Sequence, residues 1–115
     1  MAKLAPDAAI PEWAGGELVS ITRTADELSI ICATIPPEVD GERGWRCLKV
    51  RGPLDFSLTG VLASIAGPLA DAAVPIFSIS TFDTDYILVR EFDLERAKQA
   101  LIRAGHVLGG GSAMQ

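Results

Sequence analysis

The order of apolar patterns after Trp45 is the feature that most constrains the fold of this chain. Strands are expected over 45–51, 75–80 and 85–90, and helices over 56–73 and from about Asp93 to Gly105, with a short closing strand over 106–108. The helical segments repeat apolar residues every three or four positions, whereas the strands are rich in β-branched and aromatic residues. This order predicts an α+β, ferredoxin-like βαββαβ sheet with both helices on one face.

Four segments are expected along the chain. Residues 1–16 read as an extended lead-in, because they contain prolines and a Gly15–Gly16 pair but no sustained periodicity. Residues 17–44 read as a β-hairpin turning at Ala25–Asp26, followed by a loop marked by Pro36–Pro37. Residues 45–108 form the complete α+β unit, and residues 109–115 form a flexible tail.

Composition and charge exclude several classes of partner. The chain is 49% hydrophobic and 22% charged, which is typical of a packed globular protein. Its net charge of -5 disfavours nucleic acids and anionic membrane surfaces, since both are bound by clustered Lys and Arg. The most apolar stretch, 61–80, is interrupted by Pro68, Asp71 and Pro75, so it is not expected to span a membrane. The first residues lack the apolar core of a signal peptide, and we expect a cytoplasmic protein.

The sequence contains no recognisable catalytic or metal-binding pattern. His106 is the only histidine and follows the last expected helix, so no nucleophile and base can be paired with it. Cys32 and Cys47 are far apart in apolar runs and are expected to act as small buried hydrophobes. Asp83 and Asp85 lack enough neighbouring oxygen ligands to hold a cation. We therefore expect a non-enzyme with no catalytic residue, metal or cofactor.

Three stretches carry a resemblance to a known family: ITRTADELSI (21–30), GWRCLKV (44–50) running into GPLDFSLTG (52–60), and ISTFDTDYILV (79–89). Over roughly Glu17–His106 the chain resembles small bacterial ACT-domain proteins related to the CASTOR-type cytosolic arginine sensors. The resemblance implies tandem ACT units with an amino acid held at their contact. It implies that Phe82 and Asp85 line the ligand. The implied ligand-binding residues are Leu54, Asp55, Phe56, Ser57, Thr59, Gly60, Thr81, Phe82, Asp83, Thr84 and Asp85.

The chemistry of these residues fits an amino acid independently of the resemblance. The carboxylates of Asp55, Asp83 and Asp85 can accept hydrogen bonds from an ammonium group. Amides near Ser57, at the expected helix start, can donate to a carboxylate with help from the helix dipole. Structural alternatives stay open for each: Asp55 and Ser57 are common helix caps, the other two aspartates are common turn residues, and Phe82 can fill a core.

The hairpin at 17–44 corresponds to an incomplete second ACT-like unit when it is compared with the family. A second copy of the chain can supply the missing surface, and we expect a symmetric homodimer because two-fold dimers are the commonest soluble oligomers. The sequence thus predicts a non-catalytic regulatory domain that binds an amino acid or similar small ligand at an ACT–ACT contact. The alternative is a structural or protein-interaction module that binds no metabolite.

Overall fold

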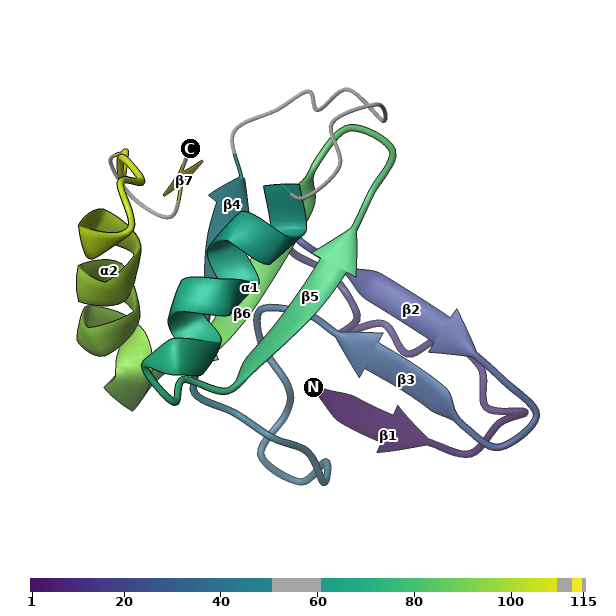
Figure 1. Ribbon diagram of the computed structural model, residues 1–115. Coiled ribbons are helices and arrows are strands. Elements are labelled where there is room, and N and C mark those ends of the chain that lie inside the picture. The colour runs from purple at the N-terminus through teal and green to yellow at the C-terminus, as the bar shows by residue number, and fades with distance from the viewer. Residues whose placement is uncertain (51–60, 110–112, 115) are drawn as a thin grey trace. The chain divides into compact units, whose positions relative to one another are not determined.

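The computed structural model describes residues 1–50, 61–109 and 113–114 (Figure 1). The chain divides into two compact units, Met1–Arg43 and Gly44–Gln115, and each is described by itself. Among the described residues neither helix is long and apolar enough to cross a membrane.

The first unit is a three-stranded antiparallel sheet. Its strands are β1 (Ala2–Leu4), β2 (Ser20–Arg23) and β3 (Leu28–Ile31), in the order β1-β3-β2. Pairs from Ser20↔Ile31 to Arg23↔Leu28 confirm the predicted hairpin. The Thr24 hydroxyl accepts hydrogen bonds from the backbone amides of Asp26 and Glu27, which closes the turn.

Strand β1 lies within the expected lead-in and was not predicted. It pairs with β3 from Ala2↔Ile30 to Leu4↔Leu28, and a three-residue strand is too short to show an alternating pattern in sequence. Ala2 is buried together with Leu28, Ile30 and Ile35, which form the apolar centre of this unit.

The second unit has the predicted ferredoxin-like arrangement. Its elements are β4 (Trp45–Val50), α1 (Val61–Asp71), β5 (Ile76–Ser80), β6 (Asp85–Arg90), the short 3₁₀ turn η1 (Glu91–Asp93), α2 (Leu94–Arg103) and β7 (Ala113–Met114). The strand order is β5-β6-β4-β7, and β6 runs antiparallel to both neighbours. Helix α1 is therefore the crossover between β4 and β5, which run in the same direction on either side of β6.

One apolar core lies between this sheet and the two helices. Leu48, Val50, Ile87 and Val89 alternate along β4 and β6 and point to one face, as the two-residue repeat of a strand requires. Helix α1 contributes Ile65 and Leu69 to the same core, and α2 contributes Ala97 and Leu101. Both helices therefore cover the same face, as the sequence predicted (Figure 1).

The two helices end in the same way. At the end of α2 the His106 amide bonds the Leu101 carbonyl and the Gly105 amide bonds the Ile102 carbonyl, with Gly105 at φ 95°. This pair of bonds is the Schellman motif, and it confirms Gly105 as the helix stop. Helix α1 ends with the same two bonds, but Ala73 occupies the left-handed position at φ 58°.

Three expectations at the edges of elements need correction. Asp93 precedes α2 as predicted, but its side chain makes no capping hydrogen bond, because η1 comes first and the carboxylate bonds Arg96 instead. In place of the strand expected over 106–108, this stretch has a single bridge residue, Leu108. The expected flexible tail instead supplies β7, which pairs parallel to β4 at Lys49↔Ala113; a two-residue strand shows no sequence pattern that could have indicated this pairing. The first residues of the predicted 56–73 helix lie outside the described residues.

Candidate ligand site at the β5–β6 turn

The turn between β5 and β6 is held by one threonine. The Thr81 amide donates to the Thr84 carbonyl at 2.8 Å, and the Thr81 hydroxyl accepts from the Thr84 amide at 3.3 Å. The same hydroxyl also lies 3.1 Å from the Thr84 carbonyl oxygen. A side-chain oxygen that bonds the backbone in this way fixes a tight turn, so the residues at its tip have a defined place at the end of the sheet.

Thr84 ties this turn to the end of β4. It is one of two buried polar residues among those described, and its hydroxyl donates a hydrogen bond to the Val50 carbonyl. Val50 is the last residue of β4, and residues 54–60, which contain the other predicted ligand-binding residues, follow it in the sequence. The bond therefore fixes the β5–β6 turn next to the end of β4.

Asp85 is the first residue of β6 and lies in the row of core residues. Since Ile87 and Val89 point to the helix-covered face, the two-residue repeat places Asp85 on that face as well, at its end. Its Oδ1 accepts a hydrogen bond of 2.5 Å from the hydroxyl of Ser80, the residue directly opposite on β5. Asp85 is half-buried, so the structure provides a held carboxylate at the rim of the core.

Phe82 and Asp83 form the exposed tip of the turn. Phe82 is 80% exposed and is therefore not the core plug that the sequence left open. Of the predicted residues, the structure brings Thr81, Thr84 and Asp85 together around the turn. The others (Leu54, Asp55, Phe56, Ser57, Thr59 and Gly60) lie outside the described residues. Ser80 was not predicted; the signal that could have found it is the four-residue turn 81–84, which pairs the residues on either side of it, Ser80 and Asp85.

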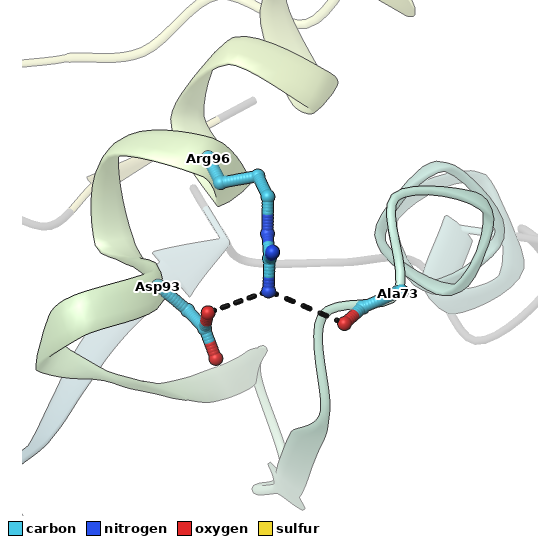
Figure 2. Close-up of polar contacts among 3 residues, drawn as sticks. All are labelled: Ala73, Asp93 and Arg96. Atoms are coloured by element: carbon cyan, nitrogen blue, oxygen red, sulfur yellow. Dashed lines mark hydrogen bonds and ion pairs between the residues drawn. The ribbon is translucent and has the colours of Figure 1, made fainter.

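A second polar cluster joins the two helices at another place. The Arg96 guanidinium donates to Asp93 Oδ1 at 2.6 Å and to the Ala73 carbonyl at 3.3 Å (Figure 2). Asp93 is buried, whereas its partner is exposed. A buried carboxylate that is already paired and links two helix termini has a structural role, so this cluster is not a candidate ligand site.

The sheet face opposite the helices is apolar and aromatic. The Trp45 and Phe77 rings lie 4.6 Å apart, and the Arg90 guanidinium lies 4.7 Å from the Trp45 ring. Cys47 lies on the same strand face as Trp45, and burial raises the pKa of its thiol, which therefore stays protonated at neutral pH. Within the described ranges, no group of three or more histidine, cysteine, aspartate or glutamate side chains is arranged to hold a metal.

The four-stranded sheet with two helices on one face defines a small α+β domain of the ferredoxin-like kind. Residues 40–103, more than half of the chain, match the sequence profile of the ACT domain, and the chain belongs to this family. Residues 1–37 match a second profile, which describes an N-terminal domain. The predicted family and the α+β fold are both confirmed.

The relatives include proteins named "cytosolic arginine sensor for mTORC1 subunit 1". The Bos taurus protein is 41% identical over 66 residues, which cover 56% of this chain and 20% of that protein. The Homo sapiens protein is 48% identical over 48 residues, 41% of this chain and 15% of that one. The chain thus spans a fifth or less of the length of these relatives. A crystal structure from Agrobacterium tumefaciens is 48% identical with a TM-score of 0.84, covering 90% of this chain and 80% of that one.

Proposed function

We propose that this chain is a non-catalytic regulatory domain of the cytoplasm that binds a cationic amino acid at the β5–β6 turn. The observation that carries the proposal is the Asp85 carboxylate, which is half-buried and held by Ser80 at the end of the helix-covered face. A fixed carboxylate favours an ammonium or guanidinium group over a neutral side chain. The relatives named as arginine sensors make L-arginine the first ligand to test.

The second half of the site is proposed to come from the predicted ligand-binding residues within 54–60 and from a second copy of the chain. The Thr84 bond to Val50 supports the first part, because it fixes the turn at the last residue of β4, which precedes residues 54–60 in the sequence. A homodimer would place two such turns at an ACT–ACT contact. Sedimentation velocity with and without L-arginine tests this part, and a monomer under both conditions would contradict it.

Isothermal titration with L-arginine tests the ligand and the site together. Asp85→Asn keeps the shape of the side chain but removes its charge, and a hydrogen bond to a charged group contributes about 1.5–3 kcal/mol. We therefore expect a Kd about 10 to 150 times higher for the variant. L-Citrulline, which is neutral, should bind the parent as weakly as L-arginine binds the variant.

Asp26→Asn is the matched control, because Asp26 is an exposed turn aspartate in the first unit and should leave the Kd unchanged. Equal affinity of the parent and Asp85→Asn for L-arginine would remove the site. No heat with any of the twenty amino acids would remove the function.

The alternative function is a protein-interaction module that binds no metabolite. The aromatic pair of Trp45 and Phe77 on the helix-free face favours it, since such residues are common at protein interfaces. A partner captured with equal strength in the presence and absence of L-arginine, together with silent titrations, would favour this alternative over the sensor.

A further inference from the structure

Ser80 is the one side chain that the structure shows bonded to the Asp85 carboxylate among the described residues. The two residues face each other across β5 and β6, and the hydroxyl lies 2.5 Å from Oδ1. A hydrogen bond of this length to an ionised oxygen is of the strong, charge-assisted kind. Ser80 lies on β5, and its pairing with Asp85 in the sheet sets the side from which its hydroxyl approaches the carboxylate.

This bond occupies only part of the acceptor capacity of Asp85. A carboxylate has two oxygens with about four lone-pair sites, and Ser80 uses one of them. No other side chain in the described part of the chain is bonded to this carboxylate, so its remaining sites can accept from a donor outside the sheet. A carboxylate whose rotamer is already fixed by one hydrogen bond loses less side-chain entropy when it binds a cation with its other lone pairs.

We propose that Ser80 is a positioning residue that holds the Asp85 carboxylate in one orientation for the cationic group of the ligand. The proposal rests on the proposed function, in which Asp85 contacts a cationic amino acid. It adds that the selectivity for a cation over a neutral analogue depends on a second residue, one strand away, that does not itself touch the ligand.

Three single variants test the proposal in the full chain. Ser80→Ala removes the hydroxyl, Ser80→Thr keeps it on a residue that suits a strand, and Ser78→Ala is a matched serine of the same strand that is also exposed. Side-chain NMR couplings report the χ1 angle of Asp85 in the free protein. We expect a single χ1 in the parent, Ser80→Thr and Ser78→Ala, and averaging among rotamers in Ser80→Ala.

The same variants are then titrated with L-arginine and L-citrulline. Releasing one rotamer-rich side chain should weaken L-arginine binding about two- to tenfold in Ser80→Ala, with L-citrulline unaffected and Ser80→Thr restored. An unchanged χ1 in Ser80→Ala, or a changed χ1 with unchanged L-arginine affinity, would overturn the proposal. If the parent binds no L-arginine while χ1 behaves as expected, the proposed function fails and the coupling of Ser80 to Asp85 stands.

Discussion

Ala73 carries a left-handed backbone at the end of α1, where the corresponding residue of α2 is Gly105. For a residue with a Cβ this conformation costs about 1–2 kcal/mol, whereas glycine adopts it freely. Ala73→Gly removes that cost. Glycine also gives the unfolded chain more conformational freedom, which lowers the free energy of unfolding by about 0.4–1 kcal/mol. We therefore expect the free energy of unfolding to rise by about 0.5–1 kcal/mol, measured by urea denaturation.

Ala70→Gly is the control for this prediction. Ala70 is exposed inside the same helix, where glycine should lower the free energy of unfolding by about 1 kcal/mol. A loss of stability in Ala73→Gly as large as that in Ala70→Gly would show that the left-handed backbone at Ala73 is not a source of strain.

At the scale of elements, the sequence predicted the helices and strands that are long enough to show a characteristic residue pattern. Strands β5 and β6 were placed within a few residues because they are runs of β-branched and aromatic residues, and helix α2 because its apolar side chains recur every three or four positions. Strands β1 and β7 were missed, since three and two residues show no period and their stability comes from pairing with β3 and β4. The turn residues of the candidate site were found, whereas Ser80 was missed because its role depends on a cross-strand neighbour.

The contact between the ends of α1 and α2 depends on Arg96. Arg96→Ala leaves the buried Asp93 carboxylate without its guanidinium partner and removes a donor to the Ala73 carbonyl. A buried acceptor left unpaired costs about 1–3 kcal/mol. Because the Arg96 side chain is exposed and solvent screens its charge, we expect a loss of stability near the lower end of this range. Urea denaturation should show it, with Arg96→Lys losing less. Gln99→Ala, an exposed change in the same helix, should have no effect; an equal loss there would contradict the role of Arg96.

At the scale of the whole molecule, the two units differ in how much apolar core each contains. The second unit buries Leu48, Ile65, Leu69, Ile87 and Leu101 in one cluster that draws on both helices and the sheet. The first unit buries four apolar residues: Ala2 on β1, Leu28 and Ile30 on β3, and Ile35 in the chain after β3. Chains of about forty residues seldom bury enough surface to fold alone. The second unit is therefore expected to be the independently stable part.

Expression of residues 44–115 alone tests this asymmetry. Because every member of the buried cluster lies in this fragment, we expect cooperative urea unfolding and dispersed amide NMR signals, whereas a peptide of residues 1–43 should give neither. Non-cooperative unfolding of the fragment would show that its core needs the first unit.

If the fragment folds, titration with L-arginine then locates the ligand site: affinity equal to that of the full chain requires the β5–β6 turn and the rest of the site to lie within residues 44–115. A large loss of affinity from a folded fragment assigns part of the site to the first 43 residues.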